Sequence, residues 1–96
     1  MNTQELNGIL KTNEYNCVKM SSTWCGPCKT MGKTIEDVKC DYPNINFIEI
    51  DIEESPEIAN EYKVRSIPTV LYIKNGDVKD KSVGNIAREK LTALTA

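Results

Sequence analysis

The chain has 96 residues, enough for one hydrophobic core and too few for two, so we expect a single domain over residues 1–96. Its residues are 40% apolar and 27% charged, and a formal net charge of −2 without a basic stripe argues against a nucleic-acid partner. No stretch approaches the roughly 20 apolar residues of a membrane span, and residues 1–16 lack the features of a secretory signal, so we expect a cytoplasmic protein without membrane contact.

The first half of the chain predicts helices and strands in alternation. Apolar residues at helical spacing predict helices over residues 2–11 and 27–39. Residues 15–21 and 46–52 are rich in strand-forming residues and predict two strands. Because a helix connects these strands, we expect them to be parallel.

The second half predicts a helix, a β-hairpin and a last helix. Ser55-Pro56 supplies an N-cap followed by a proline, which favours a helix start. Residues 69–74 and 78–83 predict strands, and Asn75-Gly76 between them is a strong hairpin signal. Asn85 is expected to cap the last helix. This order indicates an α/β fold with a central four-stranded mixed sheet and helices on both faces.

The segment Trp24-Cys25-Gly26-Pro27-Cys28 joins the first strand to the following helix. Its two cysteines are close enough in sequence to close into a disulfide and reopen. Pro27 suits the first turn of a helix, where its missing N–H leaves no bond unmade. Cys25 then lies at a helix N-terminus, where free amide donors and the helix dipole favour the thiolate, the form that attacks disulfides.

The other two cysteines have simpler interpretations. Cys17 is expected to be a small buried core residue. Cys40 is expected to be a semi-exposed inert thiol, with regulatory oxidation or intermolecular pairing as alternatives. Two cysteines supply only half of a tetrahedral zinc site, and the chain has no histidine. We therefore expect no bound cofactor or metal beyond a redox-active Cys25-Cys28 disulfide, with metal capture between two chains as an alternative.

With this motif and element order, the chain resembles the thioredoxin family from about residue 16 to its C-terminus. A lone Cys-x-x-Cys is a weak signal, whereas the full pentapeptide at a strand-to-helix junction with a proline loop downstream is specific. The active-site signature of the family matches Trp24-Cys25-Gly26-Pro27-Cys28-Lys29, and its cis-proline loop matches Ser66-Ile67-Pro68-Thr69. The hairpin matches Lys74-Asn75-Gly76, and the substrate-facing glycine loop matches Val83-Gly84.

The resemblance implies a protein-disulfide reductase of the electron-carrier type, active in cell redox homeostasis. An exposed Cys25 attacks a substrate disulfide, and a shielded Cys28 then attacks Cys25 to release the reduced product. A thioredoxin reductase, NADPH-linked or ferredoxin-linked, regenerates the dithiol. The partners implied are this reductase and protein disulfide substrates, and we expect the chain to be a monomer.

The resemblance also implies a substrate surface around the cysteines. Trp24 is expected to shield the Cys25 sulfur and to present an aromatic edge to substrate. A cis Ile67–Pro68 bond facing the cysteines would leave the Ile67 backbone free to pair with an extended substrate. The candidate substrate-binding residues are Trp24, Gly26, Pro27, Ile67, Pro68, Val83 and Gly84.

The chain departs from the family's pattern in several places. The family's N-terminal edge strand is missing from the predicted elements, which leaves four strands. Ser21 stands where the family commonly has an aromatic residue, so we expect a more polar surface around Cys25. Lys33 replaces a kinking proline, so we expect a straighter helix.

The last departure concerns Lys19 and Glu49, which stand where the family usually has a buried aspartate and a neighbouring lysine. In one interpretation Lys19 reaches solvent through the gap left by the small Ser21. In the other, Lys19 and Glu49 form an ion pair and join Cys25 and Cys28 as catalytic residues. Glu49 then accepts the proton of Cys28 while Lys19 keeps the carboxylate ionised.

Two other functions remain open at this point. A glutathione-linked oxidoreductase of the same fold is disfavoured by the Gly-Pro dipeptide and by the absence of a Cys-Pro-Tyr-Cys motif. A non-catalytic binding subunit with this fold is disfavoured by the intact cysteine pair.

Overall fold

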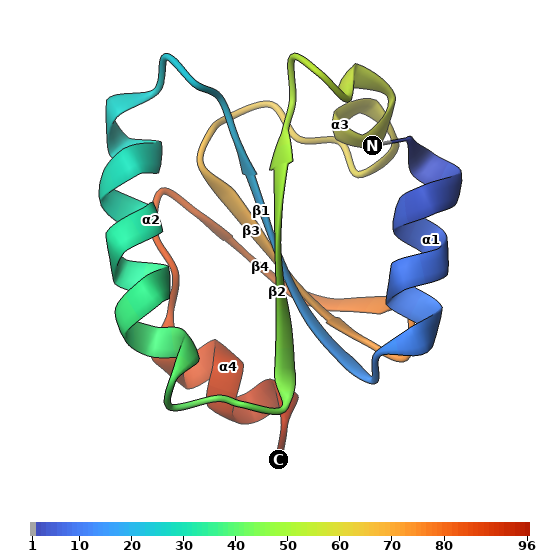
Figure 1. Ribbon diagram of the computed structural model, residues 1–96, viewed down its shortest axis with the longest axis vertical. Helices are drawn as coiled ribbons and strands as arrows, with labels where there is room; N and C mark the ends of the chain where they lie inside the picture. The colour runs from blue at the N-terminus through green and yellow to red at the C-terminus, as the bar shows by residue number, and fades with distance from the viewer. Residues whose placement is uncertain (1) are drawn as a thin grey trace.

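A computed structural model describes residues 2–96 and shows four strands between two layers of helices (Figure 1). The elements in chain order are α1 (Thr3–Thr12), β1 (Tyr15–Ser21), α2 (Gly26–Lys39), β2 (Ile45–Asp51), α3 (Pro56–Glu61), β3 (Thr69–Lys74), β4 (Asp77–Val83) and α4 (Arg88–Leu94).

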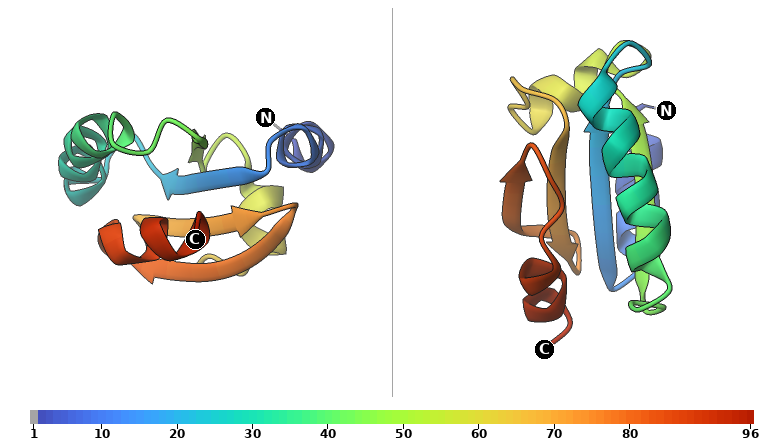
Figure 2. Two further views of the ribbon diagram at one scale, coloured as in Figure 1. Left: turned by 90° about the horizontal axis from the view of Figure 1, so that it is seen from below. Right: turned by 90° about the vertical axis from the view of Figure 1, so that its left-hand side faces the viewer.

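The sheet has the strand order β2-β1-β3-β4. β1 and β2 are parallel and connected through α2, whereas β3 is antiparallel to both β1 and β4. Figure 2 shows α2 and α4 on one side of the sheet and α1 and α3 on the other. The predicted mixed four-stranded sheet with helices on both faces is therefore confirmed.

Alternation along the strands divides the apolar residues between two cores. On the α2 and α4 side, Cys17 of β1 packs in a cluster with Met31 and Leu91. On the opposite side, Val18 of β1 packs in a cluster with Leu6 of α1, among other residues. Because α2 rests on the first of these cores, the packing fixes the helix whose N-terminus carries the two cysteines.

The β3–β4 hairpin forms at the predicted place. Asn75 and Gly76 have φ angles of 52° and 83°. Positive φ at both central residues is the conformation that a tight hairpin turn requires, and asparagine and glycine adopt it most readily. The Asn75 N–H also donates to the Glu14 carbonyl at 2.8 Å, which ties the turn to the start of β1.

The start of α4 differs from the prediction, because Ala87 and not Asn85 is its N-cap. The side-chain oxygen of Asn85 accepts the N–H of its neighbour Ile86 at 2.9 Å and so does not reach the helix. The N–H of Ala87 instead donates to the hydroxyl of Tyr72 on β3 at 2.9 Å. A side chain from the sheet therefore holds the N-cap residue, while no side chain caps the first turn of α4.

At the other end of the chain, α1 begins with a capping box. The side-chain oxygen of Asn2 accepts the Glu5 N–H at 2.8 Å, and the Glu5 carboxylate accepts the Asn2 N–H at 3.3 Å. None of the helices within residues 2–96 has the length and apolar character needed to cross a bilayer.

Candidate active site

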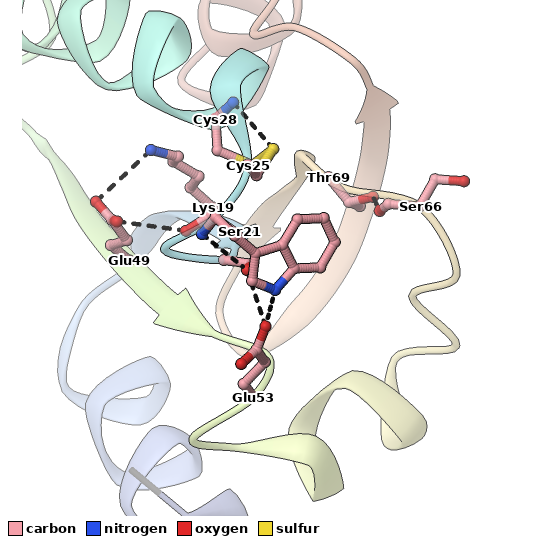
Figure 3. The surroundings of a disulfide bond; sticks show 10 residues. Lys19, Ser21, Cys25, Cys28, Glu49, Glu53, Ser66 and Thr69 are labelled. Carbon is pink, nitrogen blue, oxygen red and sulfur yellow. Dashed lines mark hydrogen bonds and ion pairs between the residues drawn. A yellow bond between two sulfur atoms is a disulfide. The ribbon is translucent and has the colours of Figure 1, made fainter.

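Cys25 and Cys28 form a disulfide at the first turn of α2, with their Cα atoms 5.3 Å apart (Figure 3). Cys25 is the N-cap residue and has an extended backbone, and Gly26 and Pro27 occupy the first helical positions. The Sγ atom of Cys25 accepts a hydrogen bond from the backbone N–H of Cys28 at 3.2 Å. Donors at a helix N-terminus stabilise negative charge, so this position favours a Cys25 thiolate once the disulfide opens.

Both cysteines are buried in the disulfide form, with exposed fractions of 5% for Cys25 and 2% for Cys28. The expectation of a shielded Cys28 is met. The expectation of an exposed Cys25 is wrong for this state. Its sulfur is bonded to Cys28 and turned toward the first turn of α2, where it accepts the N–H described above.

Trp24, next to Cys25 in the chain, is 68% exposed and so leaves an aromatic surface open to solvent. The indole N–H donates to the carboxylate of Glu53. The same carboxylate accepts the Ser22 hydroxyl at 3.1 Å, and the Ser22 hydroxyl oxygen accepts the backbone N–H of Trp24 at 3.3 Å. Glu53 therefore orients Trp24, a role that the sequence analysis missed.

The proline loop and the glycine loop meet next to the disulfide. The Ile67–Pro68 peptide bond is cis, and the Pro68 carbonyl accepts the Gly84 N–H at 2.9 Å. Within the proline loop, the Thr69 hydroxyl donates to the Ser66 carbonyl at 2.5 Å (Figure 3). These two predicted substrate-binding segments are therefore brought together by a backbone hydrogen bond.

The glycine loop also borders an open pocket at the start of α2. Its volume is about 380 Å³, and its lining residues are Pro27, Thr30, Met31, Thr34, Gly84 and Asn85. Val83 beside it is 61% exposed. Gly26 is exposed as well, and a Cβ atom added there would meet no other atom within 4 Å. Most of the substrate-binding candidates are thus exposed, whereas Ile67 is half-buried and Pro68 is buried.

Lys19 and Glu49 are partners in the parallel register of β1 and β2, and they form the predicted ion pair with a distance of 3.7 Å between Nζ and Oε2. The Lys19 side chain is 5% exposed, so it does not extend to solvent. The Glu49 side chain is 67% exposed and accepts the Ser21 hydroxyl at 3.3 Å. Ser21 is itself buried, so the prediction that it makes the surface around Cys25 more polar is wrong.

A small pocket of about 130 Å³ connects this ion pair with the redox site. Its lining residues are Lys19, Ser21, Ser22, Thr23, Cys28, Lys29, Glu49 and Asp51. Figure 3 shows the Lys19 ammonium group pointing into the space between Glu49 and Cys28. Two charged groups of opposite sign therefore share a pocket with the second cysteine.

The remaining cysteines lie away from this chemistry. Cys17 is 1% exposed, and burial raises its pKa to about 12. Cys40 is a free thiol and is exposed, more so than predicted. Among residues 2–96, no group of three or more histidine, cysteine, aspartate or glutamate side chains is placed to hold a metal ion.

Comparisons with known proteins agree with this geometry. A family model described as Thioredoxin matches residues 1–96. A thioredoxin of Mycoplasmoides gallisepticum is 39% identical over 93 residues, which cover 97% of this chain and 93% of that protein. An H-type thioredoxin of Picea mariana is 33% identical over 96% of this chain and 76% of that protein. The crystal structure of oxidized mitochondrial thioredoxin 3 from Saccharomyces cerevisiae superposes with a TM-score of 0.84 at 34% identity, covering 98% of this chain and 85% of that one.

Proposed function

The chain belongs to the thioredoxin family, and on that premise we propose how its residues divide the work of disulfide exchange. It is a thiol-disulfide oxidoreductase that reduces protein disulfides by dithiol/disulfide exchange. The observation that carries the residue assignment is the disulfide itself. Cys25 occupies the N-cap position of α2 and Cys28 lies one turn inside the helix.

In the first step, the Cys25 thiolate attacks one sulfur of the substrate disulfide. A bond forms between Cys25 and that sulfur, the substrate S–S bond breaks, and the other substrate sulfur leaves as a thiolate that takes a proton from solvent. The Cys28 N–H, which contacts Cys25 Sγ in the disulfide form, supports the charge on Cys25 before the attack.

In the second step, Cys28 attacks Cys25, the mixed disulfide breaks, and the second substrate sulfur is released with its electron pair. Glu49 accepts the proton of Cys28 across the small pocket that both residues line. Lys19 holds the Glu49 carboxylate in place through the ion pair, with 3.7 Å between Nζ and Oε2. The protein is left as the Cys25–Cys28 disulfide, and the substrate is reduced by two electrons.

The substrate lies over the open surface around Cys25. Trp24 and Val83 offer apolar contact, and the cis Ile67–Pro68 segment offers a backbone edge to an extended chain. Gly26, Pro27 and Gly84 leave room for the approaching backbone because they carry little or no side chain. The seven residues of this surface are Trp24, Gly26, Pro27, Ile67, Pro68, Val83 and Gly84.

Thioredoxin family proteins generally work with a thioredoxin reductase and with disulfide substrates. For this chain, an NADPH-linked or ferredoxin-linked reductase returns the disulfide to the dithiol, and the chain acts as a monomer. The Cys25–Cys28 pair carries the two electrons, and the reaction needs no bound cofactor. We place it in the cytoplasm, because its other two cysteines are free thiols, as expected in a reducing compartment.

Turnover of insulin disulfides tests this assignment. NADPH with a thioredoxin reductase should support rapid insulin reduction, whereas glutathione with glutathione reductase should support little. The reverse preference would favour a glutathione-linked enzyme. A double variant, Cys25→Ser with Cys28→Ser, should lose all activity, and retention of its biological activity would favour a binding subunit.

A further inference from the structure

The buried charge next to the redox site is positive. Lys19 is 5% exposed, whereas its partner Glu49 is 67% exposed. The other titratable groups that line the same pocket are Lys29, which is exposed, and Asp51, which is half-buried. Water screens charges that it reaches and leaves buried charges stronger. Of the charges that share this pocket with Cys28, Lys19 is therefore the least screened.

The ammonium group also lies against the helix that carries Cys28. A Cβ atom built on Gly32 would stand 3.5 Å from Lys19 Nζ, which is an ordinary contact distance. Gly32 lies four residues after Cys28, so the two residues share one face of α2. The absence of a side chain at Gly32 leaves room for the ammonium group one turn below the sulfur. The approach of Lys19 to α2 is thus built into the packing.

We propose that Lys19 stabilises the ionised form of the Cys25–Cys28 dithiol in the reduced protein and thereby raises the reduction potential of this pair. This inference rests on the proposed function, because it concerns the same dithiol. Glu49 moderates the effect, since its negative charge partly cancels the field of Lys19. Lys19 and Glu49 therefore tune the potential in opposite directions.

The reason lies in the balance of the exchange reaction. Two glutathione thiols give two electrons to the protein disulfide, which becomes the dithiol, while the glutathione becomes its own disulfide. The disulfide carries no charge, whereas the dithiol releases a proton to solvent when a sulfur ionises. A nearby cation lowers the free energy of the ionised dithiol only. An oxidoreductase whose reduced form is stabilised in this way is a weaker reductant.

A higher potential narrows the class of substrates. Exposed or strained disulfides have higher potentials than buried structural ones, so they are easier to reduce. Stabilisation of the dithiol by Lys19 therefore lowers the driving force for reduction of every substrate disulfide, and low-potential structural disulfides are the first to become unfavourable substrates.

Equilibration with glutathione tests the proposal in the full chain. Three single variants, Lys19→Met, Glu49→Gln and Lys33→Met, are compared in a Cys40→Ser background that removes the exposed thiol. Lys33 is an exposed lysine of α2 and serves as the matched control. The proteins are equilibrated at neutral pH with reduced and oxidised glutathione, quenched with acid and counted as dithiol or disulfide by mass spectrometry.

Lys19→Met should lower the equilibrium constant for reduction of the protein by about tenfold, the effect of losing one nearby opposite charge. This fold-change corresponds to a potential about 30 mV lower. Glu49→Gln should raise the constant by about threefold or more. Lys33→Met should stay within about twofold of the parent. A packing defect alone would not shift the equilibrium constants of the Lys19 and Glu49 variants in opposite directions.

The proposal is overturned if Lys19→Met and Glu49→Gln shift the constant in the same direction, or if both stay within about twofold of the parent. If Lys19→Met fails to fold, Glu49→Gln decides alone: a rise supports the proposal and no rise overturns it. Failure of the proposed function looks different, because the parent protein itself would then not accelerate the reduction of insulin by dithiothreitol.

Discussion

The backbone N–H of Cys28 points at the sulfur of Cys25, with 3.2 Å between the nitrogen and Sγ. This relationship assigns unequal roles to two cysteines that are chemically identical. The sulfur that receives the hydrogen bond is the one whose negative charge the helix N-terminus supports. This contact supports our proposal that Cys25 is the attacking thiol and that Cys28 resolves the mixed disulfide.

The Cys28→Ser variant should accumulate mixed disulfides with substrate proteins through Cys25, because no thiol remains to resolve them. The Cys25→Ser variant should trap nothing and lose reductase activity. Affinity capture under non-reducing conditions, followed by release with dithiothreitol, measures both. Equal trapping by the two variants would show that the roles are assigned wrongly.

Glu49→Gln should slow resolution of the mixed disulfide by roughly 10²-fold or more, because the general base for Cys28 is lost. Stopped-flow measurement of substrate release after rapid formation of the mixed disulfide gives this rate. Glu36→Gln, an exposed residue of α2 that pairs with Lys39, is a suitable control and should not change it. An unchanged rate in Glu49→Gln would remove Glu49 from the mechanism but would leave the roles of the cysteines intact.

Tyr72→Phe should destabilise the fold by about 1–3 kcal/mol, because it leaves partly buried polar groups without their partner. The Tyr72 hydroxyl accepts the Ala87 N–H at 2.9 Å and lies 3.0 Å from the Ser82 oxygen. Tyr42→Phe is the matched control, since its hydroxyl bonds Thr92 at an exposed site. Urea denaturation of both variants measures the difference. Equal free energies of unfolding for both would show that the Tyr72 hydroxyl does not support α4.

Cys17 should resist alkylation in the folded, reduced protein at about pH 8, while Cys40 reacts rapidly. Burial raises the pKa of Cys17 from 9.0 to about 12, and its side chain is 1% exposed. Iodoacetamide labelling followed by peptide mass spectrometry, with and without denaturant, measures this. Rapid labelling of Cys17 in the folded protein would contradict the core packing.

The same pKa difference predicts a pH dependence of stability. The folded-state pKa of Cys17 lies above its usual value of 9.0, so the folded state holds this proton more tightly than the unfolded state. The contribution of Cys17 is therefore fully present below pH 9.0 and is lost as the pH rises toward about 12. In Cys17→Val, the free energy of unfolding should fall less steeply over this range.

Features that depend on near neighbours or on regular strand pairing could be predicted from the sequence. The Lys19–Glu49 pair follows from two strands joined by one helix, because parallel pairing brings equivalent positions together. The Asn75-Gly76 turn follows from the backbone preferences of these two residues. Local chemistry was sufficient for the turn, whereas the pair required the family resemblance together with parallel strand pairing.

Other features depend on contacts that no local pattern encodes. The N-cap of α4 was misassigned to Asn85 because the N-cap residue, Ala87, is held by the hydroxyl of Tyr72 on β3, which lies 15 residues away. Glu53 was not recognised as the partner of Trp24, from which it is separated by 29 residues. Their contact arises only because β1 and β2 are parallel and end at the same edge of the sheet.

Trp24 is the only tryptophan in the chain, and it stands on the substrate surface with its indole N–H held by Glu53. All indole emission from this protein therefore originates at the place where partners would arrive. A docking protein that covers the ring or displaces Glu53 changes the polarity around the only emitter. The intrinsic fluorescence of Trp24 therefore reports the binding of a partner protein at this surface without an attached dye.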